Sequence, residues 1–386
     1  MSGPADIAHL GGCDGAVGLV QPAGEAILKL VPPRRGVMLL CDEHSRGIIL
    51  MTGANLRSRL RARLRDPDDP AGGRLPDLGA VTRQIFWWLT TDTFETDLAY
   101  LDLAAVLYPD TWARTVAWKP FWWVHVDLAD RFPHFARMRG TAAATGRCFG
   151  PFATAKAAER FTTLLEDALE LCRRPECGRH APHGPPCTYA QMGKCLSVCD
   201  GTTALEAYAA HVAAAVDAAA GDDADVRRQL ARQMESAAEQ LQFERADAVK
   251  KRLARLDELR TGEFAHVRPM EDFRFIVFQR SGSRRAVKAF GVCGTSITAA
   301  DRLTWPLLDE QLTDLLERIA RHAQRPPPRD RLGDYRLALV SRLLLGDEDR
   351  KRLLLHVTDQ TRVPDVRAAI TAAADLLKIP PPAPET

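Results

Sequence analysis

The chain of 386 residues is long enough for two or three domains, each with a hydrophobic core of its own. Apolar residues make up 46% and charged residues 26% of the sequence, a globular composition that excludes a fibrous or wholly disordered chain. The formal net charge of +2 excludes a uniformly basic protein, so any surface that binds nucleic acid has to be local.

The cysteine content and the absence of apolar segments bear on the compartment. The sequence has no uninterrupted apolar stretch of roughly 18 residues, and its first residues lack the features of a secretion signal. We therefore expect a cytoplasmic protein. Nine cysteines are present, four of them close together in the sequence. An odd count with one cluster favours reduced thiols and a single ligand set over a disulfide framework. The scattered cysteines are Cys13, Cys41, Cys148, Cys172 and Cys293.

The N-terminal part is predicted to form a small α+β domain. Residues 1–34 are interrupted by glycine and proline and are treated as an N-terminal extension. In 35–145, apolar runs with strand and helix patterns alternate, and Asn55 is a good N-cap for an arginine-rich helix. The predicted elements, in chain order, are GVMLLCD, GIILMTG, LRSRLRARLR, QIFWWLTT, ETDLAYLDLAAVL and FWWVHVDL.

Three further regions follow, which makes the predicted fold class multidomain α+β. Residues 146–222 are predicted to be a helical domain that contains the clustered cysteines, with Thr154 as the cap of its first long helix. Residues 223–262 predict a helical hairpin whose helices meet near Gln242. Residues 263–386 predict strands followed by helices, a small C-terminal α+β region.

The clustered cysteines follow the spacing Cys177-x9-Cys187-x7-Cys195-x3-Cys199. Four thiolates can hold either a zinc ion or an iron–sulfur cluster. Zinc ribbons usually carry C-x2-C pairs, and this segment has none, so its ligands would come from separate turns. His180 lies in the first gap, as does His183, and both are alternative zinc ligands. Spacing alone predicts a metal site and leaves zinc and iron–sulfur open.

The residues around these cysteines resemble the bacterial excision-repair subunit UvrC. The run RPECGRHAPHGPPCTYAQMGKCLSVCDG carries that family's Pro-Cys, Gly-basic-Cys and Cys-Asx-Gly elements, and CFGPFATAKAAERF is similar to its Phe-Gly-Pro-aromatic stretch. In the family the matching cysteines hold a [4Fe–4S] cluster. The resemblance implies that cofactor at Cys177, Cys187, Cys195 and Cys199, with zinc as the alternative.

The predicted hairpin carries an apolar stripe on both helices, which requires a partner surface on its own chain or on another protein. The run Leu241-Gln242-Phe243-Glu244-Arg245-Ala246 resembles the UVR motif, whose hairpin docks on a similar hairpin of UvrB in the UvrC family. The resemblance implies partner contacts at Leu241, Phe243, Glu244 and Ala246. Because UVR motifs also occur in zinc-binding regulators, a different partner stays open.

Residues 35–145 resemble the GIY-YIG nuclease domain that opens UvrC, with its chemistry eroded. Met38 and Met51 stand where the family has its two tyrosines, and methionine cannot relay a proton. Arg59 falls on the catalytic arginine, and Asp102 is the nearest acid to the metal-binding glutamate, after a one-residue insertion. We expect cleavage to be lost; Mg²⁺ would be required only if it is retained.

The arginine-rich helix is the predicted DNA contact. Arg57, Arg61 and Arg65 share one face of it and are suited to phosphates without reading sequence. A solvated basic face is the alternative interpretation.

The C-terminal third carries no convincing nuclease signature. UvrC continues into an RNase H-like nuclease and helix-hairpin-helix modules, and residues 263–386 are too few for both and show no convincing Asp/Asp/His set. We therefore expect an accessory or regulatory repair factor that docks on UvrB or a UvrB-like protein and binds DNA weakly. The alternatives are a truncated endonuclease that makes a single incision, and a metal-thiolate adaptor or sensor unrelated to DNA.

Overall fold

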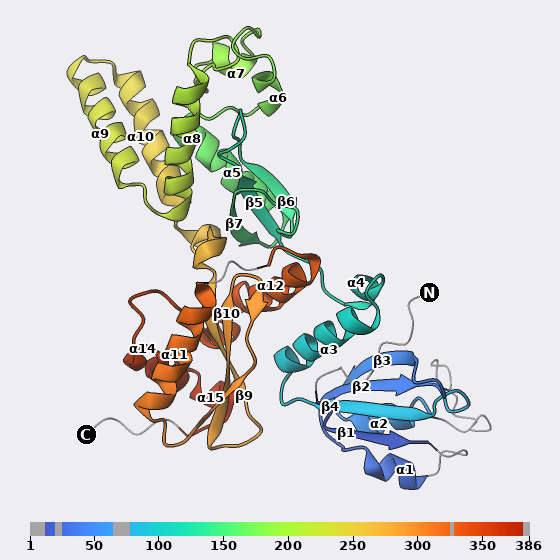
Figure 1. Cartoon of the computed structure of the whole chain (residues 1–386). Coiled ribbons are helices and arrows are strands. Elements are labelled where there is room, and N and C mark those ends of the chain that lie inside the picture. The colour runs from blue at the N-terminus through green and yellow to red at the C-terminus, as the bar shows by residue number, and fades with distance from the viewer. Residues whose placement is uncertain (1–11, 20–24, 65–77, 325–327, 381–386) are drawn as a thin grey trace.

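A computed structural model describes residues 12–19, 25–64, 78–324 and 328–380. It contains three antiparallel sheets with helices packed on them, as the predicted α+β class requires (Figure 1). None of the helices in the described ranges combines the length and the apolar character that crossing a membrane demands.

The first sheet has the strand order β1-β4-β2-β3. Its strands are β1 (Gly15–Gly18), β2 (Gly36–Cys41), β3 (Gly47–Gly53) and β4 (Gln84–Leu89). Its helices are α1 (Glu25–Leu30), α2 (Leu56–Arg61), α3 (Thr93–Leu107) and α4 (Trp112–Thr115). The predicted cap is confirmed, because the Asn55 side chain accepts from the Ser58 amide at 3.0 Å. Strand β1 lies within residues 1–34, for which the sequence predicted no strand. GAVG has no strong strand pattern of its own, and it is a strand here because it pairs with β4.

The second sheet has the order β6-β5-β7-β8. Its strands are β5 (Trp122–Val126), β6 (Ala136–Arg139), β7 (Arg147–Phe152) and β8 (Arg268–Pro269). Residues 122–126 belong to the predicted first domain, 35–145, and in the structure β5 pairs with β7, the strand that leads into the cysteine region. The expected boundary after residue 145 therefore falls inside a sheet, because strand pairing is not encoded in local pattern.

Helices follow the second sheet, close to where they were predicted. They are α5 (Ala155–Leu169), α6 (Pro175–Gly178), α7 (Thr188–Gln191), α8 (Leu205–Ala220), α9 (Ala224–Glu239) and α10 (Phe243–Glu258). The Thr154 side chain caps α5 by accepting from the Ala157 amide at 3.1 Å. The pair α9–α10 is the predicted hairpin, and it lies beside α8 (Figure 1).

The C-terminal region is built on a sheet with the order β11-β10-β9-β13, and β12 pairs with β10. Its strands are β9 (Arg274–Arg280), β10 (Ala286–Cys293), β11 (Ser296–Ile297), β12 (Asp301–Thr304) and β13 (Leu354–His356). Its helices are α11 (Asp309–Ala323), α12 (Arg331–Leu344), α13 (Glu348–Arg352), α14 (Val363–Ala372) and α15 (Ala374–Leu377). Two short 3-10 turns, Gly262–Phe264 and Met270–Asp272, lead into it.

One hydrophobic core joins the first sheet to the C-terminal region. It contains Val37 and Leu39 of β2, Leu101 of α3, Phe275 of β9 and Leu339 of α12. The opposite face of the first sheet packs on α1 and α2 in a separate core. Helix α3 is therefore sandwiched between the two sheets, as Figure 1 shows.

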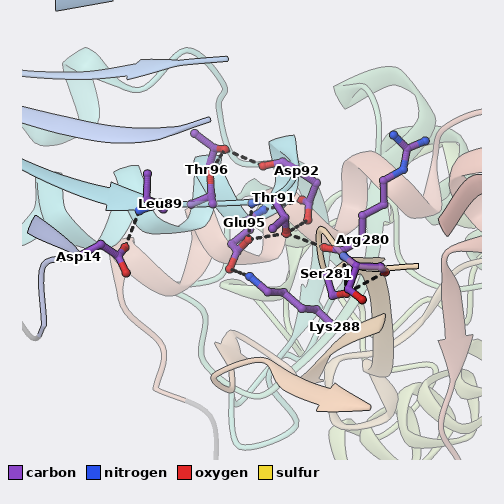
Figure 2. Close-up of polar contacts among 11 residues, drawn as sticks. Asp14, Leu89, Thr91, Asp92, Glu95, Thr96, Arg280, Ser281 and Lys288 are labelled. Carbon is purple, nitrogen blue, oxygen red and sulfur yellow. Dashed lines mark hydrogen bonds and ion pairs between the residues drawn. The ribbon is translucent and has the colours of Figure 1, made fainter. Parts of the chain in front are cut away.

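Polar contacts reinforce the joint at the N-terminal end of α3 (Figure 2). The Thr91 hydroxyl donates to the Arg280 carbonyl at 2.5 Å, and its amide donates to the Glu95 carboxylate at 2.8 Å. Glu95 in turn forms an ion pair with Lys288 of β10. The loop before α3 is thereby held against β9 and β10 of the C-terminal sheet.

Candidate functional sites: the cysteine segment, the helical hairpin and the N-terminal sheet

The cysteine segment is a series of short turns between α5 and α8. Cys177 lies in α6, and Cys187 is the residue before α7. The segment folds back on itself where the Gly184 amide donates to the Cys199 carbonyl at 2.7 Å. Gly178 packs closely on the connection between β5 and β6, since a Cβ there would lie 2.3 Å from the Phe132 ring.

The structure brings the four predicted cysteines into electrostatic contact. Burial raises the pKa of Cys195, and the neighbouring Cys187 and Cys199 raise it further. Burial likewise raises the pKa of Cys177, with added contributions from Cys187 and Cys199. Thiols that are hard to ionise alone are the kind that a metal ion deprotonates on binding. Four thiols are the donor chemistry of either an iron–sulfur cluster or zinc.

The donor atoms are near one another without enclosing a common point. Within the described ranges, no group of three or more His, Cys, Asp or Glu side chains has an arrangement that could hold a metal ion. The metal site and its cofactor therefore stay predictions. The alternative ligands His180 and His183 are exposed side chains.

Cys172 is a fifth cysteine at this segment, which the sequence spacing set aside. Burial raises the pKa of Cys172 to about 12, and Cys195, Cys177 and Cys187 contribute to the rise. It follows the end of α5, where Glu170 adopts a left-handed conformation and turns the chain toward α6. In the sequence, the only sign that Cys172 belongs to this segment is its position a few residues before Cys177.

The base of the helical hairpin packs on its own chain. Val249 and Leu256 of α10 are buried in the same core as α5. Arg252 fixes the contact, since its Nε donates to the Ala168 carbonyl at 2.8 Å and its guanidinium lies 3.0 Å from the Glu170 carboxylate.

The tip of the hairpin is exposed. The Leu241 side chain is 73% exposed and that of Phe243 is 66% exposed, although both are large and apolar. Glu244 is exposed beside them, and Ala246 is half-buried. Leu241 has a φ of 59°, the left-handed conformation that reverses the chain between the helices. The predicted apolar stripe therefore has two parts. Its base is buried against the rest of this chain, whereas the apolar side chains at its tip are not covered by any of the described residues.

The two positions expected to carry nuclease tyrosines are core positions. Met38 and Met51 are opposite each other in the β2–β3 pair, with 0% and 4% of their surfaces exposed. They pack with Leu56 and Leu60 of α2. A thioether pair in an apolar core supplies neither a hydroxyl nor a route for a proton.

The predicted catalytic residues Arg59 and Asp102 are separated by the sheet. Arg59 is exposed on α2, whose apolar side packs on one sheet face, whereas Asp102 belongs to α3, which packs on the other. Asp102 is half-buried and pairs with Arg336 of α12 at 2.8 Å. Burial raises the pKa of Asp102, and the Arg336 guanidinium opposes that rise.

The predicted DNA-contacting arginines have different surroundings. Arg57 is engaged inside the chain, since its guanidinium donates to the carbonyls of Lys29 and Val31, each at 2.9 Å. Arg61 is exposed and also interacts within the chain. Arg65 lies outside the described residues. Arg57 thus ties α2 to the C-terminal end of α1, a contact that a helical wheel does not reveal.

Comparison with known proteins identifies the cysteine region first. The family model "UvrC/Cho excinuclease, middle domain" matches residues 121–218, which start at β5 and end in α8. No solved structure matches the chain.

Curated relatives extend the similarity over much of the chain. The UvrABC system protein C of Nitrobacter hamburgensis is 27% identical over 72% of this chain and 40% of its own length. That of Nitrobacter winogradskyi is 31% identical over 53% of this chain and 30% of its own. That of Rhodopseudomonas palustris is 25% identical over 88% of this chain and 49% of its own. The chain spans less than half the length of these relatives, and its residues 121–218 are similar to the middle domain of UvrC proteins.

Proposed function

We propose that this chain is an accessory or regulatory factor of nucleotide excision repair that docks on UvrB or a UvrB-like protein through the tip of the α9–α10 hairpin. The observation that carries the proposal is the exposure of Leu241 and Phe243 at that tip. Two adjacent large apolar side chains in water are unfavourable unless a partner covers them. The nearby Glu244 carboxylate supplies a polar contact at the rim of the same surface.

The attachment of the hairpin base supports docking by a preformed surface. Arg227 of α9 pairs with Asp223 at 2.8 Å and with Asp257 of α10 at 2.7 Å, which links the two helices. Arg252 links α10 to α5. A tip held on a rigid base loses little conformational entropy when it binds.

The surroundings of the N-terminal sheet support a role other than incision. The tyrosine positions are filled by the buried Met38–Met51 pair, and Asp102 is neutralised by Arg336. Losing a general base lowers the rate by about 10²- to 10⁴-fold. In this chain Arg59 and Asp102, the other two predicted catalytic residues, also lie on opposite faces of the sheet. The alternative, a truncated endonuclease that makes a single incision, requires Mg²⁺ and Arg59 in roles that the Met38–Met51 core does not support.

The cofactor of the proposed protein is a [4Fe–4S] cluster held by Cys177, Cys187, Cys195 and Cys199, with zinc as the alternative. When bound, the group cross-links the turns that carry its ligands and supplies no proton-transfer chemistry. The chain's own part is to present four thiols from α6, from the residue before α7 and from the turns that follow α7. DNA binding in this proposal is weak and independent of sequence, through exposed arginines of α2 such as Arg59 and Arg61.

Binding of the purified chain to UvrB tests the proposal. In the double variant Leu241→Ala/Phe243→Ala, we expect the affinity for UvrB to fall by at least about thirtyfold, because two exposed anchors are removed. Leu308→Ala is the matched control, since Leu308 is 51% exposed on the C-terminal region and far from the hairpin in sequence. It should bind UvrB as the parent chain does.

Two outcomes would reject the proposal. If the chain binds neither UvrB nor DNA at low salt, an adaptor or sensor with another partner becomes the better interpretation. If it nicks damaged duplex DNA in the presence of Mg²⁺ and loses this activity on Arg59→Ala, the chain is a working nuclease.

A further inference from the structure

A cleft with a volume of 470 Å³ opens where the N-terminal sheet meets the C-terminal region. One wall is the start of α3 with Arg35, and the other is formed by β9, α12, α13 and α15. The volume lies in the range of small-molecule sites, and such sites occur preferentially between domains. None of the residues proposed above for partner, metal or DNA binding lines it.

Gln279 lines this cleft with a buried polar group that has no partner in the described part of the chain. It is 6% exposed, and its amide nitrogen is buried without a hydrogen-bond partner. Strand alternation places it on the same face of β9 as Val277 and Phe275, which is the face toward α3 and α12. A buried donor without an acceptor is destabilising, so an acceptor brought by a ligand would remove that cost.

Four arginines supply positive charge at the cleft: Arg35, Arg280, Arg342 and Arg350. Among the described residues, the Arg35 side chain has no hydrogen bond or ion pair of its own, and its charge acts on Asp97. Arg280 donates from its Nε to the Leu376 carbonyl at 2.7 Å. Its two terminal nitrogens form no hydrogen bond or ion pair with the described residues (Figure 2). Guanidinium groups with unused N–H donors bind phosphate in a bidentate manner.

The remaining lining provides two further kinds of contact. Five leucines and Phe94 form an apolar surface, which suits the face of an aromatic ring. Asp92, Asp97 and Asp349 provide carboxylates that accept from hydroxyl or amino groups. With four arginines and three aspartates, the lining carries a net charge of 4 − 3 = +1, which favours an anion.

We propose that this cleft binds a nucleoside phosphate, with the phosphate at Arg35 and Arg280, a base oxygen or ring nitrogen accepting from Gln279, and the base against the leucines. The ligand is a free mononucleotide or an unpaired nucleotide of a single strand, which present the same groups. The site goes beyond the proposed docking function and does not depend on it. Because its walls belong to two regions of the chain, a bound nucleotide also strengthens the joint between them.

Calorimetric titration of the full chain tests the site with AMP, dAMP, adenosine, inorganic phosphate, a short single strand and a duplex. We expect the mononucleotides to bind at least about tenfold more tightly than adenosine or phosphate alone, because only they use both surfaces. A free nucleotide as the natural source predicts that the single strand binds no better than AMP. An unpaired nucleotide as the source predicts that the single strand binds better than both AMP and duplex.

Three variants locate the binding. Gln279→Leu keeps the size of a buried side chain and removes the donor, and Arg35→Gln removes one charge; each should weaken AMP by roughly five- to tenfold. Arg302→Gln, at an exposed position on β12, should leave the affinity unchanged. Thermal melting of each variant shows whether it is folded.

The proposal is overturned if no nucleotide or single strand binds at millimolar concentration, or if folded Gln279→Leu binds AMP as the parent does. Neither result bears on UvrB binding, which Leu241→Ala/Phe243→Ala tests separately.

Discussion

Asp92 shows how a single side chain at the joint is tuned by its surroundings. It is the N-cap of α3, and its carboxylate accepts from the Glu95 amide at 2.9 Å. Burial raises the pKa of Asp92 to about 6; the bond to the Glu95 amide and the Lys288 charge oppose the rise, and the Glu95 charge adds to it. The ionised form is therefore less favourable in the folded chain than in the unfolded chain.

Replacing Asp92 by Asn should reduce the dependence of stability on pH. A carboxyl with a raised pKa contributes stability that is complete below its unfolded value of 3.8 and is lost as the pH rises through about 6. Asn keeps the cap acceptor and has no charge. We expect the stability advantage of Asp92→Asn over the parent to be larger at pH 8 than at pH 4, by on the order of 2 kcal/mol. Urea unfolding at both pH values measures this; an equal difference at both would contradict it.

The five cysteines near α6 make the cofactor testable one residue at a time. We expect the chain purified without oxygen to be brown, with about four iron atoms per chain. Cys187→Ser should lose the iron and its visible absorption, because a matched ligand is removed. Cys172→Ser should keep both, because Cys172 falls outside the matched spacing. A colourless parent protein with one zinc would refute the cluster, and iron loss in Cys172→Ser would refute the assignment of the four ligands.

At the scale of elements, the contact between α3 and the C-terminal region combines surface ion pairs with a buried aromatic pair. Asp102–Arg336 and Asp97–Arg342, at 2.8 and 3.1 Å, join α3 to α12 with partly exposed partners. Phe94 of α3 and Phe290 of β10 are buried, with ring centroids 5.3 Å apart in an edge-to-face arrangement. Exposed ion pairs contribute little, whereas a buried aromatic side chain contributes several kcal/mol.

Substitutions in this contact should differ in cost accordingly. Phe94→Ala should lower the free energy of unfolding by about 3 to 5 kcal/mol, because it leaves a cavity between two elements. Arg336→Gln should lower it by about 1 kcal/mol or less. Denaturant unfolding of the two variants gives both numbers. A larger loss for Arg336→Gln than for Phe94→Ala would show that the ion pairs, and not the apolar core, hold α3.

At the scale of the molecule, α12 connects three regions. Its Asp334 carboxylate accepts from the Thr141 amide at 2.5 Å and from the Thr141 hydroxyl at 2.9 Å, which fixes the loop before β7. Its Arg336 binds α3, and its Leu339 belongs to the core shared with the N-terminal sheet. The segment before it adds a bond from Arg329 to the Ala144 carbonyl at 3.1 Å.

The shared core predicts that the N-terminal sheet and the C-terminal region unfold together. Calorimetry of the full chain should therefore show one transition for both, since neither buries this surface alone. Asp334→Ala leaves the buried Thr141 donors unpaired and should separate the melting of the second sheet from the rest. Two well-separated transitions in the parent chain would instead show that the regions are independent.

Much of the local structure could be predicted from the sequence because it is encoded locally. The caps at Asn55 and Thr154 and the hairpin around Gln242 lie where propensity and periodicity placed them, since each depends on residues within a few positions. The residues around the four cysteines pointed to UvrC for the same reason, since a run of neighbouring residues is a pattern in sequence. The replacement of both tyrosine positions by methionine was likewise visible without coordinates.

Only the tertiary structure decided which regions share a core and which polar side chains are bonded within the chain. The pairing of β5 with β7, the engagement of Arg57 by carbonyls near α1, and the partner of Asp102 on α12 all join residues far apart in sequence. The cleft with its unpaired Gln279 exists only because two regions meet. Such contacts depend on how surfaces pack, which local pattern does not specify. Residues 263–386, whose sequence predicted structure and no chemistry, therefore form one wall of the site that we propose.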